Sequence, residues 1–184
     1  MKNKSEIFII TLVRDILSQN VSYFFQKHSK FLNDLSGKNN LSIEELQSVY
    51  LNKDLIYTLP RFINWFDSEL KVVTGIDVFS YDFDISKGYS IIKKDNVNLL
   101  IIRMEDLNCV FSEAINQFLG VHLELKNSNQ SENKKYSELY SEFKNTLNFN
   151  QELISQAYNS KLMKHFYSQE EIDSFMIKWN KNNI

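Results

Sequence analysis

The sequence IFIITLVRDILSQNVSYFF, residues 7–25, contains the transition that decides the fold. Its first part, from Ile7 to Val13, is a continuous apolar run rich in β-branched residues, which is typical of a strand buried on both faces. After Arg14 the apolar residues Leu17, Val21 and Phe24 recur at the spacing of a helix. The sequence therefore predicts that a buried strand passes into a helix at Arg14.

A second stretch of the chain has the same character. Residues 99–102 (LLII) form an uninterrupted apolar run that also ends in an arginine, Arg103. Both runs are too uniformly apolar for a sheet that is covered on one side only. We therefore expect two adjacent parallel strands covered by helices on both faces, accompanied by strands at residues 76–81 and 88–94.

Helix signals occupy most of the remaining chain. Capping boxes predict two helix starts, a proline predicts the first turn of another helix, and glycines predict helix ends. These residues are Ser42 with Glu45, Ser168 with Glu171, Pro60, Gly37, Gly75 and Gly120. The predicted class is α/β, with a small, mostly parallel sheet flanked by helices and a largely helical C-terminal part. Since neither a linker nor a repeat divides residues 1–184, we expect a single domain.

Composition excludes several classes of function. The net charge of −2 gives no general attraction to nucleic acid or to anionic lipid, so an anion site would have to be local. The one cysteine, Cys109, excludes an internal disulfide, and its apolar helical context predicts a buried thiol. The apolar run near the N-terminus is too short to span a membrane and no cleavage site follows it, which predicts a cytoplasmic protein. No cluster of residues has the spacing of a metal site.

Two arginines occupy the positions where ligands of parallel sheets bind. Such ligands lie beyond the carboxyl ends of the strands, and Arg14 and Arg103 each follow a predicted strand. A guanidinium offers a planar fork of donors that suits a phosphate. Ser22, two helical turns after Arg14, could donate to the same anion. The alternative is that each arginine pairs with a neighbouring acid, Asp15 or Glu105.

The order of these residues resembles the 3′-phosphate motif of the sulfotransferases, in which an arginine that ends a strand precedes a helical serine. Residues 99–108 (LLIIRMEDLN), followed by FLG at 118–120, resemble a late strand and helix of the same superfamily. Four further segments resemble the capsular polysaccharide synthesis protein family, a bacterial sulfotransferase-like group: WFDSE (65–69), GIDV (75–78), GY (88–89) and KHFYS (164–168). The resemblance covers most of the chain and rests on the order and spacing of short motifs.

This resemblance implies a P-loop-like fold and sulfuryl transfer from 3′-phosphoadenosine 5′-phosphosulfate (PAPS) to a saccharide hydroxyl, without a metal. The residues it would assign to the nucleotide, as PAPS or its product 3′-phosphoadenosine 5′-phosphate (PAP), are Arg14, Ser22, Arg103, Lys161 and Lys164. Those that would face the saccharide acceptor are Trp65, Asp67 and Glu69. Asp67 and Glu69 lie two apart on a predicted helix and would point in different directions. The two lysines could equally belong to an exposed basic loop.

The sequence departs from the sulfotransferases at one point. Their 5′-phosphosulfate is held by a glycine-containing loop before the arginine–serine motif, whereas six residues without glycine precede the first strand here. The segment SGKN at 36–39 lacks the sequence context of such a loop. Two functions therefore stay open: a sulfotransferase-like protein of bacterial capsule synthesis, and a non-catalytic remnant or module that binds a nucleotide or a protein partner. We expect no sulfotransferase activity from this chain by itself.

Overall fold

A computed structural model of the chain describes residues 5–30, 32, 42–126 and 136–180. The predicted helix end at Gly37 and the segment 36–39 lie outside these residues. The elements are β1 (Ile7–Val13), α1 (Ile16–Lys27), α3 (Ile43–Val49), the π-helical turn η1 (Tyr50–Asp54), α4 (Leu55–Trp65), the π-helical turn η2 (Phe66–Leu70), α5 (Lys71–Thr74), the 3₁₀ turn η3 (Val78–Ser80), β2 (Tyr89–Lys94), β3 (Val97–Arg103), α6 (Leu107–Leu119), α7 (Ser137–Thr146), α8 (Gln151–Tyr158), α9 (Lys161–Phe166) and α10 (Gln169–Trp179).

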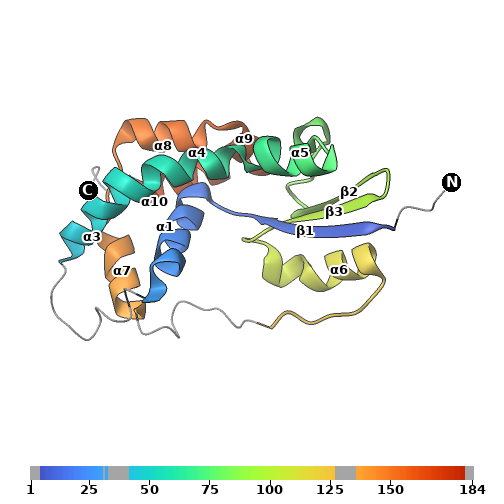
Figure 1. Ribbon diagram of the computed structural model, residues 1–184, viewed down its shortest axis with the longest axis horizontal. Coiled ribbons are helices and arrows are strands. Elements are labelled where there is room, and N and C mark those ends of the chain that lie inside the picture. The colour runs from blue at the N-terminus through green and yellow to red at the C-terminus, as the bar shows by residue number, and fades with distance from the viewer. Residues whose placement is uncertain (1–4, 31, 33–41, 127–135, 181–184) are drawn as a thin grey trace.

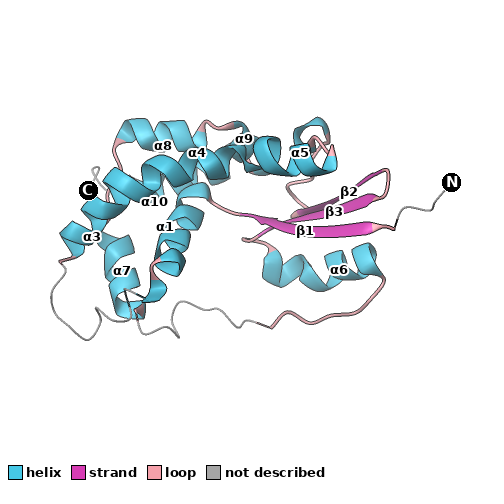
Figure 2. Cartoon of the chain, viewed as in Figure 1, coloured by secondary structure: helices cyan, strands magenta, loops and turns pink. Residues whose placement is uncertain are grey.

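The sheet forms one end of the molecule and helices form the other (Figures 1 and 2). Helix α6 lies against one face of the sheet, and α5 lies on the opposite side. Helices α1, α3, α7 and α8 gather beyond the carboxyl end of β1. The chain therefore enters the helical part of the molecule directly at the corner between β1 and α1.

The strands are arranged in the order β1-β3-β2. Strand β1 pairs with β3 in parallel, which confirms that the two apolar runs are adjacent parallel strands. Strand β2 is antiparallel to β3, so the sheet is mixed and the prediction of a mostly parallel sheet was wrong. The reason is local: a tight turn with Asp95 in the left-handed region joins β2 to β3, and so short a connection permits only antiparallel pairing.

The strand predicted at residues 76–81 is absent, because the turn η3 occupies its centre. The backbone carbonyl of Asp77 accepts bonds from the amide (3.0 Å) and the hydroxyl (2.7 Å) of Ser80. These local bonds hold the chain in a turn, although the apolar residues of the segment are spaced as in a strand.

Burial differs between the two parallel strands. All seven residues of β3 are buried: Leu99 and Ile101 lie in the main core, and Leu100 and Ile102 pack against α6. Strand β1 is instead an edge strand with several half-exposed apolar side chains, so the prediction that helices cover both of its faces was wrong. The helix on that side, α6, contacts β3 and β2.

Helix signals were mostly reliable. Both capping boxes are present, at Ser42 and Ser168, and the predicted helix ends at Gly75 and Gly120 are confirmed by their left-handed conformations. The prediction that Pro60 lies in the first turn of a helix was wrong. Pro60 lies inside α4, within a helical run that continues from residue 43 to residue 74. Its side chain is exposed, so water can satisfy the carbonyl that a proline leaves without a donor.

Cys109 is exposed, which contradicts the predicted buried thiol. The buried residues of α6 are Ala114, Ile115 and Phe118. Cys109 lies on the opposite side of that helix, because residues face the same side only at separations of three or four.

Two glycines offer a matched test of the packing around the sheet. Gly88 and Gly120 have nearly equal φ angles, 74° and 71°, but a Cβ on Gly88 would lie 2.7 Å from an Asp106 carboxylate oxygen, whereas one on Gly120 meets nothing within 4 Å. Both alanine variants should lose about 1–2 kcal/mol to backbone strain. We expect Gly88→Ala to lose a further 1–3 kcal/mol or so in urea unfolding, since Arg103 holds Asp106 in place. Equal losses of unfolding free energy in the two variants would show that the Asp106 side chain moves aside without a cost in stability.

Candidate functional site

The corner between β1 and α1 brings together the two residues predicted to bind a phosphate. Arg14 donates from Nη1 to Ser22 Oγ over 3.2 Å, and Ser22 Oγ lies 3.1 Å from the hydroxyl of Tyr140 on α7. Both Arg14 and Ser22 are partly exposed. Within the described residues Arg14 forms no ion pair, and the predicted alternative partner, Asp15, is occupied elsewhere. Two donors that solvent can reach therefore converge beyond the carboxyl end of β1.

Asp15 is a buried carboxylate that sequence reasoning considered only as a partner for Arg14. It is 1% exposed. Its Oδ1 accepts from the Tyr158 hydroxyl at 2.5 Å, and its Oδ2 accepts from Ser18, from Lys178 at 3.1 Å and from Trp179 Nε1 at 3.3 Å. Burial and the Asp15 charge raise the pKa of Tyr158 far above its ordinary value, so this phenol remains a donor at any physiological pH. An aspartate at a strand-to-helix junction gives no sequence signal that distinguishes this role from an ordinary helix cap.

A cavity of about 310 Å³ opens beside Arg14. It lies past the carboxyl ends of β1 and β3, as expected for ligands of a parallel pair. Its lining residues are Arg14, Asp15, Ser18, Met104, Glu105, Phe175 and Lys178. Lys178, which sequence reasoning missed, places its ammonium 2.7 Å from Ser18 Oγ. This corner cavity thus combines two cations with two carboxylates.

Both carboxylates of the corner cavity already accept hydrogen bonds. Asp15 has the donors described above, and Glu105 accepts from the Asp15 amide at 2.9 Å and from the Tyr167 hydroxyl at 2.8 Å. Burial and the Glu105 charge raise the pKa of Tyr167 strongly, so its proton is retained. Arg14 is therefore the cation of this corner whose charge no carboxylate in the described chain neutralises.

Arg103, the second predicted phosphate ligand, is 4% exposed and fully engaged. It forms ion pairs with Asp106 (2.5 Å) and Glu171 (2.9 Å), and its Nη1 donates to the Phe166 carbonyl at 3.2 Å. The sequence had suggested Glu105 as the acid that pairs with Arg103, but the structure pairs Arg103 with Asp106 and Glu171 instead. These contacts tie the end of β3 to α9 and α10.

The basic stretch that could have been an exposed loop is the short helix α9. Lys161 lies 3.5 Å from Asp67 and 4.1 Å from the centre of the Phe79 ring, and Lys164 is exposed. Burial, followed by the charge of Lys161, lowers the pKa of His165. The structure therefore brings Lys161 to the predicted acceptor residue Asp67, and its contacts do not include Arg14 or Ser22.

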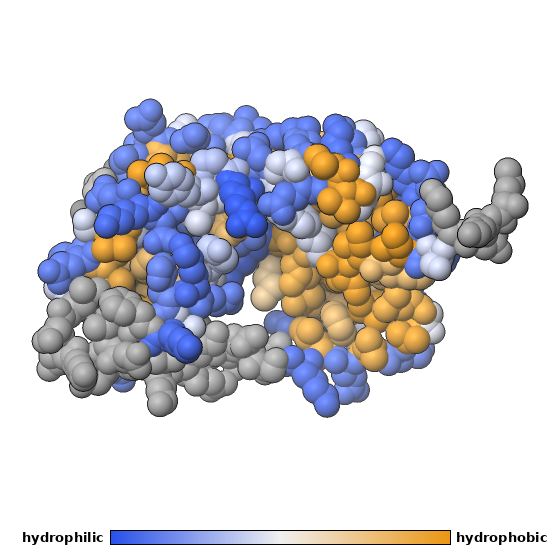
Figure 3. Space-filling model, in the orientation of Figure 1, coloured by the Kyte–Doolittle hydropathy of each residue, from blue (hydrophilic) through white to orange (hydrophobic). Residues whose placement is uncertain are grey.

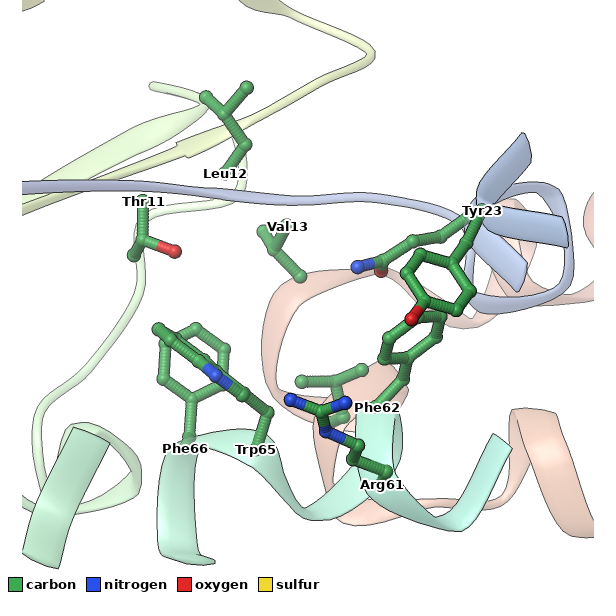
Figure 4. A pocket seen from close by; sticks show the side chains of 10 residues that line it. Thr11, Leu12, Val13, Tyr23, Arg61, Phe62, Trp65 and Phe66 are labelled. Atoms are coloured by element: carbon green, nitrogen blue, oxygen red, sulfur yellow. The ribbon is translucent and has the colours of Figure 1, made fainter. Parts of the chain in front are cut away.

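A second cavity, of about 250 Å³, lies on the other side of the corner (Figure 4). Its lining residues are Thr11, Leu12, Val13, Gln19, Tyr23, Arg61, Phe62, Trp65, Phe66 and Leu162. The rings of Tyr23, Phe62 and Trp65 surround the opening, and the Arg61 guanidinium lies among them (Figure 4). We call it the aromatic cavity; of its residues the sequence had indicated only Trp65.

Asp67 and Glu69, the two acidic residues near the aromatic cavity, point toward different partners, as the sequence predicted. Asp67 pairs with Lys161, whereas Glu69 accepts from Arg61 Nε at 3.3 Å. Both acids lie in the π-helical turn η2 that follows α4. They do not form an acid/base pair.

Helix α1 separates the two cavities. Ser18 lines the corner cavity and Gln19, the next residue, lines the aromatic cavity. The same division holds where the strand ends: Val13, its last residue, lines the aromatic cavity, and Arg14, the next residue, lines the corner cavity. A ligand at Arg14 and a ligand at Trp65 would therefore bind on opposite sides of one short piece of backbone.

Among the described residues, no group of three or more His, Cys, Asp and Glu side chains could hold a metal ion. In the same part of the chain, no helix is both long and apolar enough to cross a bilayer.

Residues 34–168 of the chain match a family model described as "Putative capsular polysaccharide synthesis protein". The match covers most of the chain and includes the aromatic residues of α4 and all of β2, β3, α6 and α9. Neither a curated protein nor a solved structure matches the chain.

Replacement of the buried carboxylate tests the importance of the corner for stability. Asp15→Asn keeps the shape but removes the charge that its donors surround. We expect it to lose about 2–4 kcal/mol in urea unfolding, and the emission of Trp179 to shift to the red. The control Asp173→Asn, an exposed aspartate on α10 bonded to Gln169, should lose less than about 0.5 kcal/mol. Unchanged stability of Asp15→Asn would mean that the amide serves this site as well as the carboxylate.

Proposed function

Because this chain belongs to the family of capsular polysaccharide synthesis proteins, we propose that it binds a 3′-phosphoadenosine nucleotide and serves sulfuryl transfer to a saccharide hydroxyl. In this proposal Arg14 and Ser22 hold the 3′-phosphate. The observation that supports it most directly is the 3.2 Å approach of Arg14 Nη1 to Ser22 Oγ, on an arginine that no carboxylate in the described chain neutralises.

The donor set fits a phosphate dianion. A guanidinium has five N–H donors, and the bond to Ser22 uses one of them, so Arg14 can also present two parallel donors to phosphate oxygens. The Ser22 oxygen can accept from the Tyr140 hydroxyl, which lies 3.1 Å away, and its own proton can then be donated to a phosphate oxygen. Since Asp15 and Glu105 are engaged by their own donors, their repulsion of an incoming anion is reduced.

The aromatic cavity suits the saccharide acceptor. Aromatic faces pack against the apolar C–H surface of a sugar ring, while the few polar groups at Gln19, Arg61 and Thr11 can orient its hydroxyls. PAPS would supply the sulfuryl group: its S–O bond to the 5′-phosphate would break as a new S–O bond to the acceptor oxygen forms, PAP would leave, and the acceptor hydroxyl would lose its proton to water. The residues of this chain would act by binding and orientation, with the 3′-phosphate giving binding energy remote from the reacting sulfur.

The nucleotide assignment predicts a specific order of affinities. In calorimetric titrations PAP should bind more tightly than adenosine 5′-phosphate, because only PAP carries the 3′-phosphate. Arg14→Ala should weaken PAP binding at least tenfold, since a charge-assisted hydrogen bond contributes about 1.5–3 kcal/mol. Ser22→Ala should cost about fivefold, and Arg14→Lys should also lose affinity because an ammonium lacks the fork.

Arg61→Ala is the control for these titrations, since it removes an arginine from the other cavity and should leave PAP affinity within about twofold of wild type. Equal binding of the two nucleotides, or wild-type affinity in Arg14→Ala, would contradict the assignment. As expected from the sequence, this chain by itself should transfer no label from PAPS to a capsular saccharide. Turnover above a no-enzyme control would contradict that expectation and would show catalysis in place of the alternative, nucleotide binding without turnover.

The acceptor assignment can be tested by fluorescence. The chain has two tryptophans, and Trp179 is 1% exposed, so an emission change on adding capsular oligosaccharides should come from Trp65. We expect Trp65→Phe to abolish the change and Trp65→Ala to weaken binding at least fivefold, about 1 kcal/mol of lost ring contact. Tyr57→Ala, which removes an aromatic side chain that is 79% exposed, should have no effect. Saccharide binding unaffected by Trp65→Ala would place the acceptor elsewhere.

A further inference from the structure

The outer edge of β1 carries backbone groups that no strand in the described chain pairs with. Ile7 donates its amide to the Asn96 carbonyl at 2.8 Å, and the Val13 carbonyl accepts from Met104 at 2.8 Å. The odd-numbered residues of the strand therefore direct their amides and carbonyls toward β3. Because these groups alternate along a strand, those of Phe8, Ile10 and Leu12 point away from the sheet.

The same residues expose apolar side chains. Phe8, Ile10 and Leu12 are 48%, 47% and 44% exposed, and the Phe8 ring lies 5.5 Å from that of Phe118, on the α6 side of the sheet. Further exposed apolar residues are Leu119, the last residue of α6, and Val121 and Leu123 after it. In Figure 3 apolar side chains form one continuous area over β1 and α6.

This edge has none of the features that usually prevent strands from associating. Edge strands are typically interrupted by lysine, proline or a bulge, but Ile7–Val13 contains no charge and no proline and pairs with β3 residue by residue. An open apolar edge of this kind is a template for another strand.

We propose that a second copy of this chain pairs with this edge, β1 against β1, in an antiparallel register centred on Ile10. A two-fold axis makes the same surface meet itself, and only a register that matches outward-facing residues with each other can form bonds. A register centred on Ile10 meets this condition, because Ile10 opposes Ile10 of the other copy and Phe8 opposes Leu12, and all of these residues face outward. The pairing would add about six backbone hydrogen bonds and join two three-stranded sheets into one.

Charge at the ends of β1 supports this register. Glu6, which pairs with Lys93 of its own chain at 3.0 Å, precedes the strand, and Arg14 follows it. The antiparallel pairing centred on Ile10 therefore sets Glu6 of one copy opposite Arg14 of the other. Opposite charges face each other at both ends of the paired strands, and no like charges do. Cross-strand pairs of opposite charge stabilise a sheet, whereas like charges directly opposite destabilise it.

The side chains of the pairing match as well. Phe8 of one copy would lie beside Leu12 of the other on the α6 side, so that the two apolar patches become continuous. A stable interface buries about 800 Å² on each partner. The apolar area over β1 and α6 (Figure 3) would supply it.

The oligomeric state of the full chain tests the proposal. In sedimentation at micromolar concentrations the wild type should have about twice the 21.8 kDa mass of one chain. Ile10→Lys sets two ammonium groups opposite each other and should weaken the dimer at least 100-fold. The matched control, Ile56→Lys, alters an exposed isoleucine of α4 that is 59% exposed and should remain dimeric. Melting curves verify that both variants are folded.

Disulfide formation tests the register without disturbing the charge. In a Cys109→Ser background, which removes the exposed native thiol, Ile10→Cys should cross-link two copies, since opposed residues lie about 5.5 Å apart between Cα atoms. Phe8→Cys should not, because four residues of offset separate the two cysteines by about 14 Å.

Three results would overturn the proposal: a wild-type monomer at about 100 µM, which would put the dissociation constant of the dimer above that concentration; a dimer that survives Ile10→Lys; or cross-linking of Phe8→Cys as efficient as that of Ile10→Cys. If a different protein covers this edge, the purified wild type would be a monomer, which is the first of these results. Arg14 takes part in both proposals, but none of the variants changes Arg14 or Ser22. Loss of the dimer with unchanged PAP affinity, or the reverse, would therefore distinguish the failure of one proposal from the failure of the other.

Discussion

The buried carboxylate of Asp15 is the interaction on which the arrangement of the molecule depends. Transfer of a charge from water into a protein core is costly unless the charge is surrounded by donors. Asp15 meets this condition with Ser18 from its own helix, Tyr158 from α8, and Lys178 and Trp179 from α10. Residues separated by more than 140 positions in sequence are thereby joined at the point where β1 becomes α1.

The neighbouring strand end is joined to the C-terminal helices by a second set of charges. Arg103 binds Glu171 and the Phe166 carbonyl, while Glu105 receives the Tyr167 hydroxyl and the Asp15 amide. Both networks satisfy buried polar groups at the carboxyl ends of the parallel pair. Arg14 is left out of them, and for this reason its guanidinium is available to an external anion, whereas that of Arg103 is not.

The short backbone between β1 and α1 also sets the geometry of the two cavities. Residues 13 and 14 point to opposite sides of the strand, and residues 18 and 19 lie on neighbouring faces of the helix. One side therefore collects Arg14, Ser18 and Lys178, and the other collects aromatic rings around Trp65. A polar and an aromatic cavity can thus flank one corner without sharing a lining residue.

The sequence by itself determined the local structure. The apolar runs predicted β1 and β3, and the capping boxes predicted the starts of α3 and α10. Arg14 and Ser22, which the sequence assigned to one anion, lie 3.2 Å apart, and the anion itself stays a prediction. Such features depend on residues near each other in the chain. Only the tertiary structure decided which strand lies at the edge, because an apolar run looks the same whether or not a helix covers it. It alone also decided that Asp15, Lys178 and Arg61 belong to the candidate sites, since the residues that complete each cavity come from segments far apart in the chain.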